Sequence, residues 1–179
     1  MGMRAEGRIG EVKFCICHAP YKEEKHMVVY LVQHGRSFPK EVDPDRGLTD
    51  QGRAEVERVA SKASKIGLSV ALIIHSGKTR ALKTAEIFAE RLTPGSQPIM
   101  EPGLNPHDDV AAFAATLPAR DNLMVVGHLP FMERLVSYLI TTTPGKPVIR
   151  FRNAGIVCLE YDGIENTWAI RWALTPEIA

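Results

Sequence analysis

Two apolar segments that each end beside a histidine and a glycine constrain the fold of this chain more than any other feature. The first segment, 27–32, leads through one polar residue into His34-Gly35, and the second ends at Gly127-His128. Apolar runs that end at glycine predict buried strands followed by loops. A single histidine at a strand end is more often part of the core. Two such strands, however, can deliver both histidines to the edge where open α/β sheets bind ligands.

The rest of the chain predicts strands that alternate with amphipathic helices. Predicted strands cover 27–33, 70–74, 97–100 and 123–126, and predicted helices cover 51–65, 79–92, 109–116 and 131–140. Segments 155–161 and 167–174 flank a turn-rich stretch, which predicts a hairpin. We therefore expect an α/β protein, a three-layer α/β/α fold with a mainly parallel central sheet and an antiparallel C-terminal edge.

The length of 179 residues suits one folded domain, which we expect over residues 27–179. Residues 1–26 are polar and show little periodicity. We expect them to be an N-terminal arm, flexible in one interpretation and a consequence of start-site choice in another. Cys15, Cys17 and His18 could bind a metal, but no second ligand pair with zinc spacing follows them. We therefore predict no metal site and no cofactor.

The charge balance and the cysteine content exclude several classes of protein. Lys and Arg number 22 against 21 Asp and Glu, so the net charge of +1 favours neither nucleic acid nor an anionic membrane as a partner. No apolar stretch approaches the length of a membrane span, and the first residues lack the apolar core of a signal peptide. An odd count of 3 cysteines does not suit a disulfide framework. These features predict a cytoplasmic protein.

Two arginines follow the predicted strands and complete a cationic group with the histidines. Arg46 stands just before the first predicted helix, and Arg80 stands where the second strand turns into its helix. A single arginine at such a position is more often a solvated surface charge than part of a site. Together with His34 and His128 at one sheet edge, they predict an anion pocket, because the planar guanidinium matches phosphate oxygens. Helix N-termini at the same edge add N–H donors.

A neutral histidine in a phosphate pocket can act as a nucleophile. Its ring nitrogen attacks phosphorus and carries the phosphoryl group covalently, which divides one displacement into two. The neighbouring cations then neutralise the charge on the phosphoryl oxygens. We expect His34 to be this nucleophile and Arg80 to neutralise charge. His128 would act as an imidazolium or as a hydrogen-bond donor, and Gly35 would let the backbone approach the phosphate.

Four segments of the sequence, in this order, resemble the motifs of the histidine phosphatase superfamily, which has the phosphoglycerate-mutase-like fold. They are Gln-His-Gly at 33–35, Arg-Gly-Leu-Thr-Asp-Gln-Gly at 46–52, Ser-Gly-Lys-Thr-Arg-Ala-Leu-Lys-Thr-Ala at 76–85 and Gly-His-Leu-Pro at 127–130. The resemblance covers about residues 27–175 and is greatest to the small SixA-type phosphohistidine phosphatases. It implies a phosphatase whose substrate is a phosphorylated protein of the histidine-phosphotransfer type, or a small phosphorylated molecule.

Departures from the family pattern concern the phosphate contacts and the general acid. Gln33 stands where the family has an arginine that contacts the transferred phosphate, and Arg36 could supply the missing charge. The chain also lacks the inserted cap that brings a glutamate acid in larger relatives. Asp108 or Asp109 could assist the leaving group, or Asp109 could simply cap the next helix. A catalytically weak module that binds phosphorylated partners is therefore the alternative to an enzyme.

Overall fold

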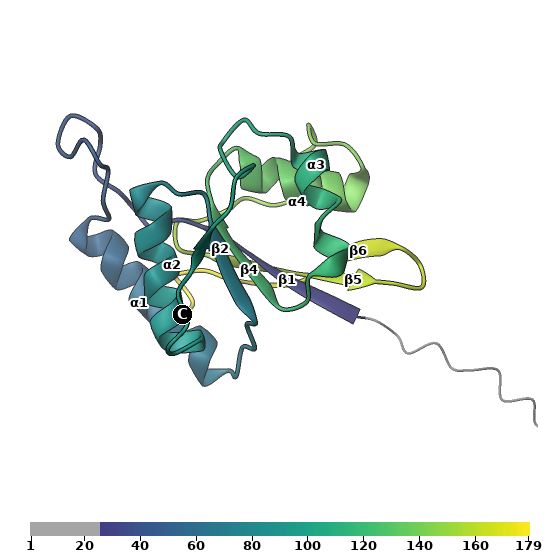
Figure 1. The fold of residues 1–179 in the computed structure, drawn as a ribbon, viewed down its shortest axis with the longest axis horizontal. Helices are drawn as coiled ribbons and strands as arrows, with labels where there is room; N and C mark the ends of the chain where they lie inside the picture. Colours follow the sequence, from purple (N-terminus) through teal and green to yellow (C-terminus); the bar gives the residue numbers. More distant parts are fainter. Residues whose placement is uncertain (1–25) are drawn as a thin grey trace, which may run out of the picture.

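The computed structural model describes residues 26–179 of the 179-residue chain. The predicted N-terminal arm, with Cys15, Cys17 and His18, lies outside the described residues apart from His26, which is already the first residue of a strand. Figure 1 shows the order of the elements along the chain. They are β1 (His26–Gln33), α1 (Asp50–Lys65), β2 (Leu72–His75), α2 (Thr79–Leu92), β3 (Ile99–Met100), α3 (Val110–Ala114), the 3-10 helix η1 (Leu117–Ala119), β4 (Leu123–Gly127), α4 (Phe131–Thr141), β5 (Ile156–Asp162) and β6 (Thr167–Leu174).

The strands form a single six-stranded sheet in the order β3-β2-β4-β1-β5-β6. The first four strands in this order pair in parallel, whereas β5 pairs antiparallel with β1 and β6 pairs antiparallel with β5. The predicted α/β class, with its mainly parallel sheet and antiparallel C-terminal edge, is therefore confirmed. Parallel pairing sends the carboxyl ends of β1, β2 and β4 to one edge, and the loops that follow them meet there.

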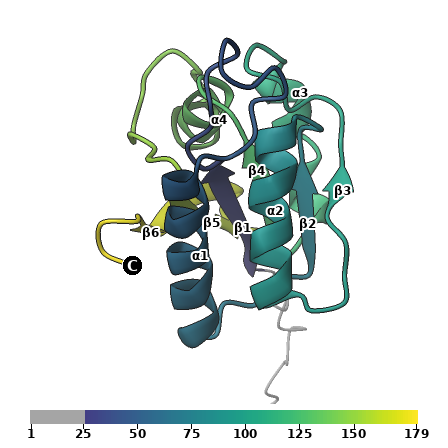
Figure 2. The same ribbon diagram turned by 90° about the vertical axis from the view of Figure 1, so that its left-hand side faces the viewer.

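Two apolar clusters, one on each face of the sheet, hold the three layers together. Helices α1 and α2 cover one face, where Val56 and Phe88 are fully buried, and α3 and α4 cover the other, where Phe131 and Leu135 are fully buried. Figure 2 shows α1 and α2 side by side in front of the sheet. Successive β1 residues alternate between the two clusters, as expected for a strand buried on both faces. The central strands are thereby fixed from both sides.

The start of α1 is determined locally by the sequence. Thr49 is the N-cap, and its hydroxyl accepts a hydrogen bond from the N–H of Gly52. Asp50 in the first turn and Lys65 in the last turn both complement the helix dipole. The helix therefore begins directly after the loop that carries Arg46. This fixes the position of that loop relative to the sheet edge.

Candidate active site

The pairing of β1 with β4 brings the two predicted histidines together. Gln33 is in register with Gly127, so His34 and His128 leave the sheet side by side at its carboxyl edge. The centroids of their rings are 4.9 Å apart. Strand β2 ends at the same edge and leads into α2, whose second residue is Arg80. The structure therefore places the three side chains that the sequence predicts as catalytic at one site.

The hydrogen bonds of the His34 ring define its protonation state. Nδ1 lies 2.7 Å from the carbonyl oxygen of Gly35, which can only accept, so Nδ1 carries the proton. Nε2 accepts a hydrogen bond of 3.0 Å from Nε of Arg80. The pKa of His34 falls from 6.5 to about 4, chiefly because the ring is buried; the Gly35 bond opposes this shift, and the charges of Arg80 and Arg46 contribute to it. The ring is neutral at pH 7, with its lone pair on Nε2.

A buried threonine connects the His34 loop to α2. The hydroxyl of Thr84, which is fully buried, accepts a 3.0 Å hydrogen bond from the Gly35 N–H and donates a 2.8 Å bond to the Arg80 carbonyl. On the opposite side, the Asn153 side chain donates to the His34 carbonyl at 2.9 Å. These bonds hold the backbones of the nucleophile and of its arginine partner in a fixed relation.

The structure shows a packing reason for glycine at position 35, which the sequence did not predict. Its N–H already donates to Thr84, so that N–H is not available for a phosphate. A Cβ atom at Gly35 would lie 2.7 Å from Cγ2 of Val56 on α1, which is too close. Likewise, a Cβ atom on Gly52 would collide with the carbonyl of Arg36. Both glycines therefore allow α1 to pack directly against the His34 loop, and the approach of phosphate to Gly35 stays a prediction.

His128 is held by a serine that directly follows β2. Its Nε2 lies 2.5 Å from Oγ of Ser76, and its Nδ1 is buried with no hydrogen-bond partner among the described residues. Burial is the largest cause that lowers the pKa of His128 from 6.5 to about 3, followed by His34, Arg80 and Lys78. The ring is therefore neutral in the free protein. It can act as a hydrogen-bond donor, and it becomes an imidazolium only when an anion raises its pKa.

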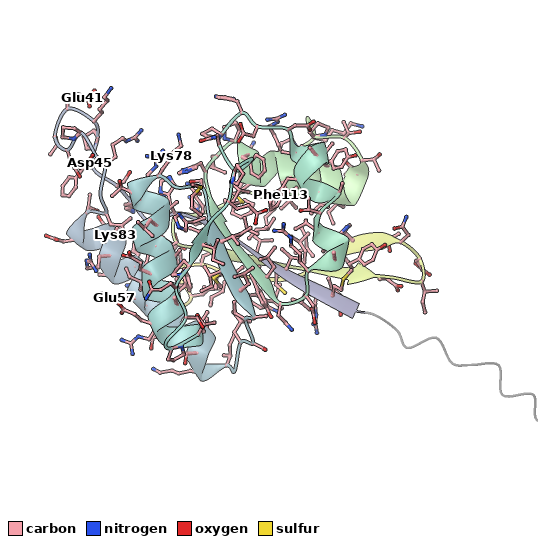
Figure 3. The ribbon with its side chains drawn as sticks, viewed as in Figure 1. Glu41, Asp45, Glu57, Lys78, Lys83 and Phe113 are labelled. Atoms are coloured by element: carbon pink, nitrogen blue, oxygen red, sulfur yellow. The ribbon has the colours of Figure 1, made fainter. Side chains whose placement is uncertain are left out.

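Arg46 and Lys78 extend the positive charge around the two histidines. The charge of Arg46 lowers the pKa values of His34, Arg80 and His128, so its guanidinium lies within electrostatic reach of all three side chains. Figure 3 shows Lys78 at the N-terminal end of α2, at the sheet edge where the loop between β1 and α1 also lies. Arg46, Arg80 and Lys78 thus create a positive field around the two neutral histidines, and such a field suits a phosphate.

Gln33 and Arg36, both predicted to bind phosphate, line a pocket of about 380 Å³ next to the histidines, together with Leu129 and Asn153. Nε of Arg36 donates to the carboxylate of Glu55 at 3.0 Å. This ion pair directs Arg36 toward α1, so the structure does not support the idea that Arg36 replaces the family arginine beside His34. Oε1 of Gln33 is buried and has no partner among the described residues. Its contact with phosphate stays a prediction.

Asp108 and Asp109, the predicted candidates for a general acid, both bond to nearby backbone. Oδ1 of Asp109 accepts from the N–H of Ala111 at 2.8 Å and caps α3, so the capping interpretation is confirmed. Oδ2 of Asp108 accepts from the N–H of Asn105 at 2.8 Å. No hydrogen bond or ion pair of the described residues joins either carboxylate to His34.

Sequence reasoning did not assign roles to several residues of this site. Ser76 and Thr84 lie inside the motif at 76–85, so their regular spacing from Arg80 is a signal that could have identified them. Asn153 is 119 positions from His34 and belongs to no motif, so only the fold reveals it. Within residues 26–179, no group of three or more His, Cys, Asp and Glu side chains could hold a metal ion, and no helix is long and apolar enough to cross a membrane.

Comparisons with known proteins agree with this geometry. The sequence profile of the histidine phosphatase superfamily (branch 1) matches residues 29–108. An uncharacterised protein of Picosynechococcus is 30% identical over 141 residues, which are 74% of this chain and 84% of the relative. The protein histidine phosphatase SixA, solved with tungstate, superposes with a TM-score of 0.73 at 24% identity, over 84% of this chain and 97% of that structure.

A candidate phosphohistidine phosphatase SixA from Agrobacterium tumefaciens superposes with a TM-score of 0.66 at 25% identity, over 84% of this chain and 98% of that structure. The matches extend beyond the profile into the C-terminal half that carries His128. The order of the motifs, the sheet topology and the paired histidines all lead to one assignment. The chain belongs to the histidine phosphatase superfamily, and its fold is that of the SixA-type branch.

Proposed function

We propose that this phosphatase removes phosphate from phosphohistidine on a protein, through a covalent phosphoryl intermediate on His34. The observation that carries the proposal is the state of the His34 ring. Its Nδ1 proton is held by the Gly35 carbonyl, and its Nε2 lone pair faces Arg80. The proton on Nδ1 leaves Nε2 unprotonated, which is the state that a neutral imidazole needs in order to attack phosphorus. Arg80 occupies that lone pair in the free protein, and in this proposal its guanidinium turns to the phosphoryl oxygens when a substrate binds.

In the first step, Nε2 of His34 forms a bond to phosphorus while the P–N bond of the substrate breaks, and the leaving imidazole takes a proton from solvent. In the second step, water attacks phosphorus, the bond to His34 breaks, and inorganic phosphate leaves. Arg80, Arg46 and His128 stabilise the phosphoryl oxygens in both steps. We assign these roles to the catalytic domain at 27–179.

A protein substrate is favoured by the lack of an inserted cap beside the site. Only a short segment joins β3 to α3, and its two aspartates are occupied by local backbone bonds. A phosphoramidate needs less help from a general acid than a phosphate ester, because the ring nitrogen of the leaving imidazole is readily protonated. The superposed protein histidine phosphatase supports the same substrate class. A cytoplasmic location belongs to the same proposal.

The alternative function is a catalytically weak module that binds phosphorylated partners. It is favoured by one observation, the uncharged Gln33 next to the nucleophile. The loss of one charge-assisted contact of about 1.5–3 kcal/mol would slow a catalyst by roughly 10- to 100-fold. This module would bind a phosphorylated protein but release no phosphate from it.

Phosphate release from three substrates distinguishes these functions. The substrates are a phosphohistidine-bearing phosphotransfer protein, free phosphohistidine and an aryl phosphate. We expect the wild type to have its highest kcat/KM on the phosphorylated protein. His34→Ala should release no phosphate from any of the three substrates. His107→Ala, which changes an exposed histidine, should match the wild type. Preference for a small phosphomonoester would contradict the protein substrate. Binding of the phosphorylated protein without turnover would favour the alternative module.

A further inference from the structure

His75 is a buried histidine next to the site, and no step described above uses it. It is the last residue of β2, is 4% exposed, and pairs in register with Val126 of β4. Its ring accepts a hydrogen bond at Nδ1 from the N–H of Gly77, two residues later, at 3.1 Å. Because burial lowers the pKa of His75 below 6.5, Nδ1 is free to accept at neutral pH.

This hydrogen bond fixes the turn that connects β2 to α2. The arrangement resembles an Asx-turn, in which a side-chain acceptor bonds the backbone N–H of the residue two positions later. Gly77 has a φ of 81°, which a side-chain-bearing residue adopts only with strain. The His75–Gly77 bond and the glycine conformation together therefore define this turn.

Ser76 is the central residue of this turn, and its hydroxyl lies 2.5 Å from Nε2 of His128. The orientation of the His128 ring depends on this contact, because Nδ1 has no partner among the described residues. A hydrogen bond to one ring nitrogen determines which nitrogen carries the proton. Loss of the turn would remove this bond, so that no partner would favour one tautomer of the buried His128 ring over the other.

We propose that His75 is a positioning residue that acts through Ser76 to fix the orientation and the tautomer of His128. The inference concerns the proposed phosphatase site, but its first readout does not need turnover. The imidazole itself touches no reacting atom. Its function is to accept the Gly77 N–H, so any side chain with an acceptor at the same position should replace it.

The test compares His75→Asn, which keeps an acceptor at the position of Nδ1, with His75→Leu, which fills similar space without one. The ¹⁵N chemical shifts of the His128 ring are recorded for each folded protein. We expect one tautomer in the wild type and in His75→Asn, and shifts averaged between two tautomers in His75→Leu. One unchanged tautomer in His75→Leu would overturn the proposal, as would averaging in both variants.

Kinetics of the same variants test whether His75 acts through Ser76. We expect kcat to fall about tenfold in His75→Leu and in Ser76→Ala, as for the loss of one hydrogen bond, and to stay within about threefold in His75→Asn. The double variant His75→Leu/Ser76→Ala should be no slower than Ser76→Ala alone. Additive losses would overturn the connection. Absence of any phosphatase activity in the wild type would instead contradict the proposed function and leave the ¹⁵N test valid.

Discussion

Thr84 offers a sharp test of how the site is held together, because one hydroxyl connects the nucleophile loop to the helix of Arg80. We consider Thr84→Val, which keeps the shape of the side chain and replaces the hydroxyl with a methyl group. The Gly35 N–H, which now donates to Thr84 at 3.0 Å, would lose its acceptor in a fully buried position. An unsatisfied buried donor costs about 1–3 kcal/mol, so the free energy of unfolding should fall by that amount.

Thr84→Ser is the matched control. It retains the hydroxyl and loses one methyl group, at a cost of about 1 kcal/mol of stability. Both variants are thus expected to be destabilised, but only Thr84→Val frees the backbone at Gly35 and Arg80. A displacement of about 1 Å between reacting groups can slow a reaction by roughly 100-fold. We therefore expect kcat/KM to fall at least tenfold in Thr84→Val and to stay within about threefold in Thr84→Ser.

Urea unfolding and phosphate release measure the two quantities separately. Stability and activity of Thr84→Val equal to those of the wild type would refute the idea that this hydroxyl fixes the site. Equal activity losses in Thr84→Ser and Thr84→Val would show that the packing of the methyl group, rather than the hydrogen bonds, is what matters.

Three further predictions follow from the charges of the site. Arg80→Ala should lower kcat/KM at least 100-fold, because Arg80 donates a hydrogen bond to Nε2 of His34. Arg36→Ala should lower kcat/KM less than tenfold, because Arg36 pairs with Glu55. The reverse order would show that Arg36 contacts the phosphate. Activity should survive EDTA, because Arg46, Arg80 and Lys78 supply the positive charge, and a loss that a divalent ion restores would contradict this. The pKa of His34 is about 4 in the folded protein and 6.5 ordinarily, so the unfolded chain binds the extra proton first as pH falls. As pH falls from about 6.5 to 4, His34 should therefore lower the free energy of unfolding by on the order of 3 kcal/mol. If urea unfolding of His34→Ala had the same pH dependence as the wild type, this prediction would be wrong.

The sheet and its active edge could be predicted from the sequence because both depend on local patterns. Apolar runs that stop at glycine identified β1 and β4, and the register between them then brings His34 and His128 together. Element boundaries were less accurate. The second strand was predicted at 70–74 but forms at Leu72–His75, where β2 pairs with β4. Pairing between strands so far apart in the chain leaves no local signal.

The directions of side chains could not be predicted from the sequence. Arg36 is two residues from the nucleophile, yet Glu55, 19 residues later, determines where its guanidinium lies. Gly35 was expected to admit a phosphate, and the structure adds a second reason for glycine there, because α1 occupies the space that a side chain would need. Both interpretations depended on proximity along the chain. Packing between elements decides such questions, and a single sequence does not show which elements will pack.

The central claim is that His34 carries the phosphoryl group during turnover, and a rapid-quench experiment tests it most directly. The protein is mixed with a phosphohistidine-bearing phosphotransfer protein, quenched in alkali within one turnover, digested and analysed by mass spectrometry. We expect one phosphoryl group on the peptide that contains His34, stable in alkali and labile in acid, and none in His34→Ala. Full turnover with no phosphorylated His34 peptide at any time, or undiminished turnover by His34→Ala, would contradict the account.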